Sequence, residues 1–169
     1  STLTQIYSTQ IDLASDDYYH LRILAMILGQ LPSSLLFQEI REKRSLCYSI
    51  SSSLMPSDGL LVIQTGIDAN QYEPILPLIQ EQIERLISGD FSNKLLSIAK
   101  RMYIQNMERL DEDRSAYFNV LTQHEIMGFK FDLEELKQKV KGISKADIQK
   151  VAKQLHMNSQ SFIKGVKNA

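Results

Sequence analysis

The stretch Leu35–Ser53, LLFQEIREKRSLCYSISSS, constrains this chain most because its hydrophobic periodicity changes within a few residues. Its first part carries apolar side chains at helical spacing, at Leu35, Leu36, Phe37 and Ile40. From Cys47 to Ser53 apolar and polar residues alternate with the period of two that is typical of a strand. The change near Arg44 predicts a helix that ends shortly before a strand begins.

The rest of the chain shows further segments of each period, separated by turn residues. Strands are expected at 3–13, 60–67 and 161–166, and helices at 18–28, 72–87, 93–110, 113–127, after Asp132 and from Ser144 to Leu155. Gly29 is expected to end the helix at 18–28, and Pro77 predicts a late start or a kink in the helix at 72–87. This order predicts an α+β domain, with helices on one face of a small, mainly antiparallel sheet.

Composition limits the class of protein. The chain of 169 residues predicts a single domain, 1–169, and its 43% hydrophobic and 23% charged residues are ordinary for a globular protein. A net charge of −1 argues against binding to nucleic acid or an anionic membrane. No apolar run reaches the roughly 18 residues of a membrane span, and no signal-peptide pattern is present. We therefore expect a cytoplasmic protein, and the start at Ser1 indicates a piece of a longer one.

Catalytic motifs are missing from the sequence. The three histidines, His20, His124 and His156, do not form a pair at the four-residue spacing that would bring two imidazoles together on one helix face, so no metal site is expected. There is no nucleophile elbow, phosphate-binding loop or dinucleotide fingerprint. The single cysteine, Cys47, is better interpreted as a small apolar residue than as a nucleophile. The chain alone is predicted to bind no cofactor and to catalyse no reaction.

The run LFQEIREKRSLCYS resembles the signature of the non-catalytic C-terminal half-domain of the pitrilysin/insulinase family of zinc metallopeptidases, which includes the mitochondrial processing peptidase. Weaker similarity extends over GQLPSSLLF, IAKRMY and GISKADIQKVAKQL. The resemblance implies the LuxS/processing-peptidase-like half-domain fold. In that fold the uncovered face of the sheet and the catalytic half lie on opposite sides of a chamber. The sequence departs from the family pattern at Ser45 and Cys47, where glycine and a small residue are usual, and at Gln30 and Leu35.

By motif position, the resemblance implies that Arg41 and Tyr48 bind the backbone of a peptide substrate. The residue pattern alone favours a different interpretation, in which Arg41 forms surface ion pairs with Glu39, Glu42 or Glu81 and Tyr48 packs in the core. The zinc of the family is expected in the missing catalytic half, which would carry His-x-x-Glu-His.

The leading hypothesis is therefore a substrate-binding half-domain that completes a cleft opposite a catalytic half-domain or partner subunit. One alternative is a catalytically inactive relative that serves as a structural or interaction subunit. Another is an unrelated small α+β binding module, in which Arg41 and Tyr48 would have no special placement. An exposed sheet face also predicts possible self-association.

Overall fold

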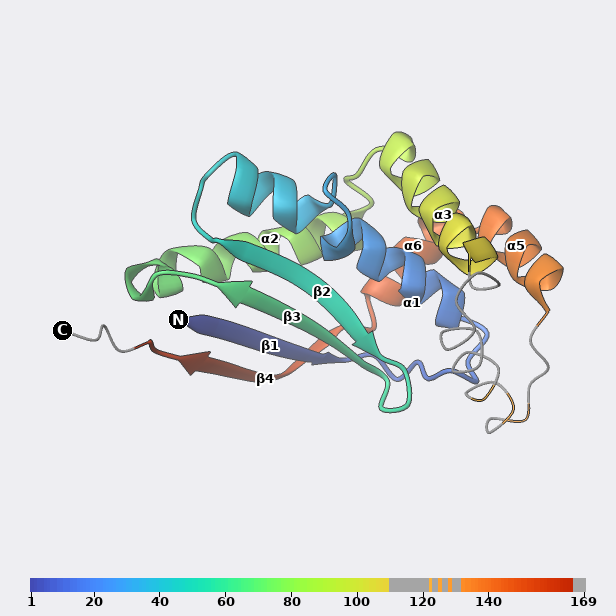
Figure 1. The fold of residues 1–169 in the computed structure, drawn as a ribbon, viewed down its shortest axis with the longest axis horizontal. Coiled ribbons are helices and arrows are strands. Elements are labelled where there is room, and N and C mark those ends of the chain that lie inside the picture. The colour runs from blue at the N-terminus through green and yellow to red at the C-terminus, as the bar shows by residue number, and fades with distance from the viewer. Residues whose placement is uncertain (110–121, 123–124, 126–127, 129–131, 166–169) are drawn as a thin grey trace.

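The computed structural model describes residues 1–109, 122, 125, 128 and 132–165. Its strands are β1 (Thr2–Ser8), β2 (Ser49–Met55), β3 (Leu60–Gly66) and β4 (His156–Ile163). They form one antiparallel sheet in the order β2-β3-β1-β4 (Figure 1). This arrangement confirms the predicted α+β class with a small antiparallel sheet.

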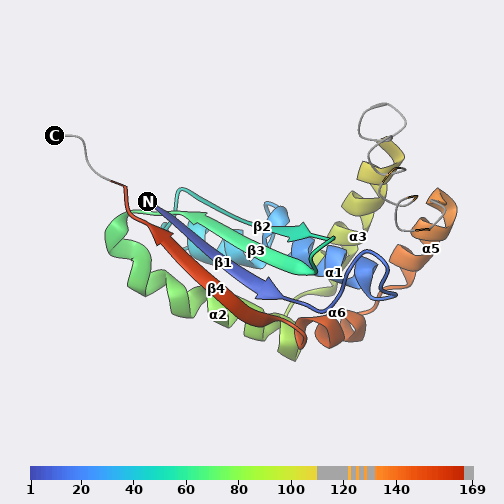
Figure 2. The same cartoon turned by 90° about the horizontal axis from the view of Figure 1, so that it is seen from below.

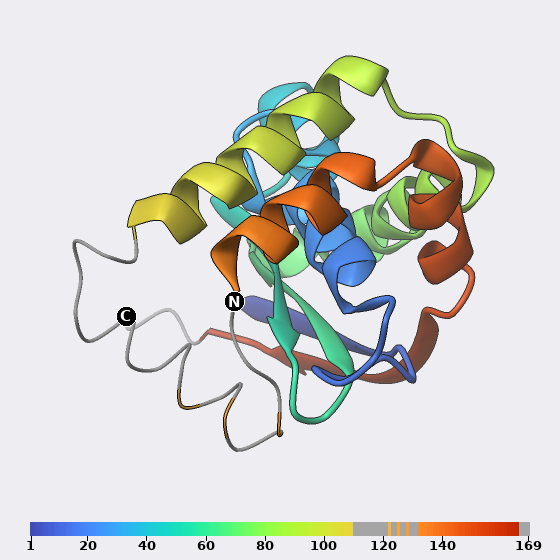
Figure 3. The same ribbon diagram turned by 90° about the vertical axis from the view of Figure 1, so that its right-hand side faces the viewer.

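All described helices lie on one face of the sheet, as two views of the ribbon show (Figure 2 and Figure 3). They are α1 (Tyr18–Ala25), η1 (Met26–Gln30), η2 (Phe37–Glu42), η3 (Ala69–Gln71), α2 (Tyr72–Ser88), α3 (Asn93–Glu108), α5 (Leu133–Gly142) and α6 (Lys145–Ala152). The helix predicted at 113–127, with His124 in it, falls outside the described residues. No described helix covers the opposite face of the sheet, which is called the open face below.

Three strand boundaries differ from those that periodicity predicts. β1 ends at Ser8 because Gln10 takes a positive φ of 55°, which an extended strand cannot continue through. β2 begins at Ser49, two residues later than expected, after the chain has reversed direction. β4 begins at His156 instead of Ser161. Nearly all of its side chains are exposed, so alternation could not reveal its first half.

Gly29 and Pro77 do not interrupt their helices as predicted. The chain continues from α1 into the π-helical turn η1, and Gly29 lies inside that turn. A Cβ on Gly29 would lie 2.7 Å from the Ser52 amide nitrogen, so the glycine allows the helix to approach β2 closely. Helix α2 begins at Tyr72 and continues through Pro77, whose side chain is exposed. The missing N–H therefore removes one helical hydrogen bond at the protein surface, without delaying the helix start.

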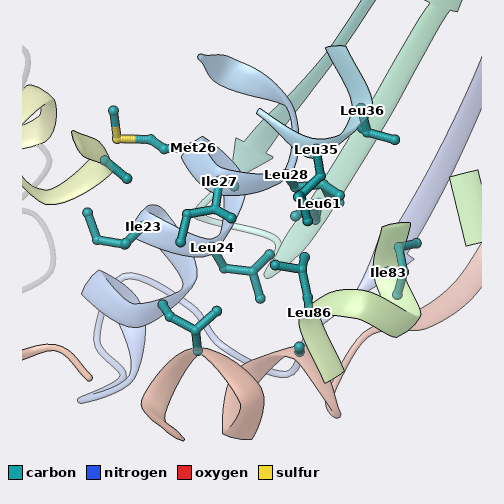
Figure 4. Close-up of a cluster of buried hydrophobic side chains, with 14 of the residues drawn as sticks. Ile23, Leu24, Met26, Ile27, Leu28, Leu35, Leu36, Leu61, Ile83 and Leu86 are labelled. Carbon is teal, nitrogen blue, oxygen red and sulfur yellow. The ribbon is translucent and has the colours of Figure 1, made fainter. Parts of the chain in front are cut away.

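The core lies between the sheet and the helices, and α1 with η1 forms its centre. Every residue from Ile23 to Gly29 is buried, which agrees with a segment that is apolar on all sides. Figure 4 shows side chains from these two elements meeting Leu61 of β3 and Ile83 and Leu86 of α2. The segment that follows η1 and carries Arg41 and Tyr48 is therefore attached to a completely buried part of the domain.

The open face of the sheet is uncharged. None of the four strands contains Asp, Glu, Lys or Arg. Serine and threonine are the most numerous residues on this face, and apolar side chains lie near the β2–β3 turn and, with Ile163, at the opposite end; its members include Thr2, Thr4, Ile6, Ser49, Ser51, Ser53, Met55, Leu60, Val62, Gln64, Ser159, Ser161 and Ile163. The face is thus more polar than the apolar patches that usually pack against another protein.

Two helix starts that the sequence predicts are present with their caps. Asp132 accepts hydrogen bonds from the backbone N–H groups of Glu134 and Glu135. Ser144 and Asp147 form a reciprocal capping box at the start of α6. Within the described residues, no helix combines the length and apolar character needed to cross a bilayer.

Candidate functional site

Arg41 lies in the last turn of η2, immediately before β2 in sequence (Figure 1). The opposite face of this helix is held by Leu36 and Ile40, which are both fully buried. The Arg41 side chain is exposed, and its guanidinium carbon lies 4.7 Å from the centroid of the Phe37 ring. This distance is within the range of a cation–π contact. Phe37, one turn earlier on the helix, therefore limits the directions that the Arg41 side chain can take.

The ion-pair interpretation assigns three acidic neighbours to Arg41, and the first of them, Glu39, binds other cations. Glu39 lies 2.7 Å from Lys43 Nζ and 3.0 Å from an Arg44 guanidinium nitrogen. The hydrogen bond from Lys43, with a further one from Arg44, lowers the pKa of Glu39. No carboxylate of the described residues lies within 4.0 Å of Arg41. Its donors therefore remain available to a ligand that approaches from solvent.

The chain reverses direction between Arg41 and Tyr48 through a left-handed residue. Ser45 has φ of 54°, and its N–H donates to the Arg41 carbonyl at 3.1 Å. The Leu46 N–H donates to the Ile40 carbonyl at 3.1 Å, so the helix ends in a closed turn. This conformation explains why glycine is usual at the position of Ser45 in the family that the sequence resembles.

Tyr48 lies at the head of β2 and points away from the core. Its backbone N–H donates to the Gly66 carbonyl at 2.8 Å, and its side chain is 66% exposed. The interpretation of Tyr48 as a core residue is therefore wrong. A hydrogen bond to the Asp68 carboxylate, together with desolvation and the negative charge, raises the pKa of Tyr48. Asp68 follows the end of β3, so the carboxylate that affects this hydroxyl is distant from Tyr48 in the sequence.

Cys47, between the two candidate residues, is a buried apolar contact. Its side chain belongs to the hydrophobic core cluster. Burial raises the pKa of the Cys47 thiol, and the positive charge of Arg41 offsets only part of this effect. A thiol with a raised pKa is a poor nucleophile at neutral pH, which agrees with the structural role inferred from the sequence.

Arg41 and Tyr48 are thus at the same end of the sheet, where η2 ends and β2 begins, and both are exposed. Each has a neighbour of its own: the Phe37 ring lies beside the guanidinium, and the Asp68 carboxylate raises the pKa of the hydroxyl. Sequence reasoning missed both neighbours, because Phe37 reads as a core residue of its helix and Asp68 is distant in sequence. Together the pair offers guanidinium N–H donors and one hydroxyl to a ligand.

The described histidines do not form a metal site. His20 Nδ1 lies 3.0 Å from an Asp17 carboxylate oxygen on α1, whereas His156 is exposed at the start of β4. Among the described residues, no group of three or more His, Cys, Asp or Glu side chains is placed to hold an ion. The described residues therefore contain no ligand set for the zinc centre of a peptidase.

A hollow lies between α3 and α5, and two of the cations that line it, Lys100 and Lys137, have partners. Lys100 donates to the backbone carbonyls of Lys141 and Ile143, at 2.5 and 2.7 Å. Lys137 lies 2.9 Å from Glu108 and 2.8 Å from Glu134. These contacts fasten the two helices together, so we assign this hollow a structural role.

The described residues form an antiparallel sheet covered by helices on one face, with an exposed arginine and tyrosine at one end and no set of metal ligands. This combination is that of a peptidase-like domain whose described part carries no zinc centre. The family model for the peptidase M16 inactive domain matches residues 3–103, and the chain belongs to this family. This membership confirms the resemblance to the pitrilysin/insulinase peptidases that the sequence carries.

Two bacterial relatives and one isolated domain show the extent of the similarity. The chain is 28% identical over 165 residues to the probable inactive metalloprotease YmfF of Bacillus subtilis, spanning 96% of this chain and 38% of that protein. A conserved protein of Enterococcus faecalis V583 superposes with a TM-score of 0.92 at 29% identity, covering 99% of this chain and 40% of that one. The inactive peptidase domain of a putative zinc protease from Bordetella parapertussis has a TM-score of 0.78 at 17% identity, and 95% of this chain covers 92% of it. The chain thus spans about two fifths of the first two relatives.

Proposed function

We propose that this domain binds the backbone of a peptide substrate through Arg41 and Tyr48, opposite the catalytic half of a zinc metallopeptidase. The observation that carries the proposal is the joint exposure of these two side chains at one end of the sheet. A core tyrosine or an ion-paired arginine would have been unavailable to a ligand. The zinc would belong to the catalytic half, or to a partner subunit that supplies it.

The two side chains differ in what they can give a peptide. The Arg41 guanidinium carries several fixed donors, which suit peptide carbonyl oxygens. The Tyr48 hydroxyl carries one proton, which it can donate to the oxyanion of a tetrahedral intermediate. The nearby Asp68 carboxylate raises the pKa of Tyr48, which keeps this proton on the hydroxyl.

A second candidate function is that of an inactive structural or interaction subunit. The name of the Bacillus subtilis relative, a probable inactive metalloprotease, favours this alternative. In that case Arg41 and Tyr48 would no longer bind a substrate for cleavage. Their replacement would then change no cleavage reaction.

The test uses the domain in a protein that joins it to a catalytic half, with a mixed pool of unstructured peptides as substrate. Arg41→Ala or Tyr48→Phe is expected to lower cleavage by roughly 10²-fold, the scale for losing one donor to the transition state. The midpoint of thermal unfolding should change little, because both side chains are exposed.

Matched controls separate a local role from a general effect. Arg101→Ala removes an exposed arginine of α3, and Tyr18→Phe removes a hydroxyl of α1; both should leave cleavage unchanged. Full activity of Tyr48→Phe would contradict the proposed role of the hydroxyl. If neither the native protein nor any of these variants cleaves a peptide, the result would favour the second candidate function, an inactive structural or interaction subunit.

A further inference from the structure

We propose that the free edge of β4 is a pairing surface for a second copy of this chain, which joins two sheets into one. In the described part of the chain, β4 is the last strand on its side and bonds only to β1. The N–H and C=O groups on its outer edge are therefore free to pair with another strand. This inference is independent of the proposed peptidase role.

The sequence of β4 lacks the features that usually protect an edge strand. HMNSQSFI contains no Asp, Glu, Lys, Arg, Pro or Gly. Its single irregularity is a register shift at one end, opposite the step from Ile6 to Tyr7, and Ser159–Ile163 pairs regularly with β1. These five residues offer a regular, uncharged edge to an incoming strand.

Met157 and Ile163 are 47% and 69% exposed, so the strand carries two large apolar side chains that face water. On the helix side, Phe162 stacks on Tyr72 at 4.5 Å between ring centroids, and Gln160 Nε2 donates to the Tyr72 hydroxyl at 2.8 Å. These contacts hold the strand on its helix side, and among the described residues its backbone pairs only with β1. The other edge strand, β2, also has one strand neighbour, but its helix side packs against η1 and η2.

Symmetry favours a second copy as the occupant. Two antiparallel copies of Ser159–Ile163 pair about a two-fold axis at Ser161, the central residue of the regular segment. Directly opposed residues point to the same face, so Ser161 meets its own copy, Gln160 meets Phe162, and Ser159 meets Ile163. Lys164 then lies opposite the uncharged Asn158, and no like charges oppose each other within the pair. Ile163 would lose its exposure to water.

Pairing in this manner continues the sheet in its own plane. The helices of both copies remain on one side, and the hydroxyl-lined open faces remain on the other. Self-association was expected from the exposed sheet face, but that face is largely polar and offers little apolar surface for face-to-face packing. The edge is the better interaction surface.

The test is sedimentation of the chain from roughly micromolar to millimolar concentration, the range in which a small interface dissociates. We expect a reversible monomer–dimer equilibrium. Ser161→Lys should raise the dimer dissociation constant roughly fivefold or more, because two lysines would face each other across the axis. Mixing Ser161→Lys with Ser161→Asp should restore the dimer as a heterodimer. Ser51→Lys, the same substitution on β2, should leave the equilibrium unchanged.

Three results would overturn the inference. A chain that stays monomeric at every concentration has no self-pairing edge. A dimer that survives Ser161→Lys uses another surface, and a dimer that Ser51→Lys dissociates is formed through β2. Circular dichroism of each variant confirms that a lost dimer reflects lost pairing and not unfolding, since Ser161 and Ser51 are both exposed and outside the core.

Discussion

The guanidinium of Arg41 lies over the ring of Phe37, with 4.7 Å between the guanidinium carbon and the ring centroid. The two residues are four positions apart on one helix, so they share a face of it. Contacts of this kind are worth about 0.5–1 kcal/mol at exposed positions. Their effect here is to hold a long, mobile side chain in one direction before a ligand arrives, which lowers the entropy lost on binding.

Phe37→Leu is expected to weaken peptide cleavage by roughly three- to fivefold, which corresponds to the loss of one exposed cation–π contact. Phe37→Tyr should retain activity because a phenol ring keeps the π face. Nuclear magnetic resonance gives a second readout: the ring-current shift of the Arg41 side-chain protons should disappear in Phe37→Leu and persist in Phe37→Tyr. Unchanged Arg41 resonances in Phe37→Leu would show that the ring does not position the guanidinium.

Ser45→Gly is expected to stabilise the domain by about 0.5–1 kcal/mol. Ser45 has φ of 54°, and a side chain in this region costs of order 1–2 kcal/mol, which glycine avoids while losing more backbone entropy. Urea unfolding measures the difference. Ser33→Gly is the control, since Ser33 is an exposed loop serine without a positive φ, and it should not stabilise. A destabilised Ser45→Gly protein would contradict the argument from backbone conformation.

Gly29→Ala is expected to destabilise the domain by about 1–3 kcal/mol, the usual cost of overpacking. The added methyl group would lie 2.7 Å from the Ser52 amide nitrogen and 3.0 Å from Ser52 Oγ, so η1 and β2 would have to separate. Thermal or urea unfolding checks this. In contrast, Gly142→Ala at the end of α5 meets no atom within 4 Å and should be tolerated. Equal stability of the two variants would be inconsistent with close helix–strand contact at Gly29.

The link between α1 and α6 should depend on pH through Asp17. Burial opposes ionisation of this carboxyl, but hydrogen bonds from Lys150 and His20 outweigh it and lower the pKa of Asp17. A depressed folded-state pKa contributes stability above the unfolded value, near 3.9, and this contribution is lost as the pH falls through the folded value.

Asp17→Asn should therefore reduce the free energy of unfolding by roughly 0.5–1 kcal/mol at pH 7, after allowance for solvent screening. The difference from the native chain should shrink toward zero near pH 2. Asp58→Asn, in the exposed turn after β2, is the control and should show no such pH dependence. A difference that stays constant from pH 7 to acid would mean that the carboxylate charge of Asp17 is not involved.

Local signals in the sequence determined most elements of the fold. The change of period between Leu35 and Ser53 identified η2 and β2, because a helix and a strand impose different spacings on the residues they bury. The caps at Asp132 and Ser144 depend on side chains within three residues, so sequence alone located the starts of α5 and α6. The motif also identified Arg41 and Tyr48 as the residues to examine.

Only the tertiary structure decided what surrounds those residues. Whether Tyr48 packs in the core depends on where β2 begins relative to the end of β3, and Asp68 can affect the pKa of the hydroxyl only because the two strands pair. Gly29 reads as a helix stop, but it is needed because β2 passes close behind the helix. β4 has no clear period because most of its side chains are exposed, so its pairing with β1 fixes it as a strand. In each case the deciding contact joins residues distant in the chain, and local spacing carries no information about such contacts.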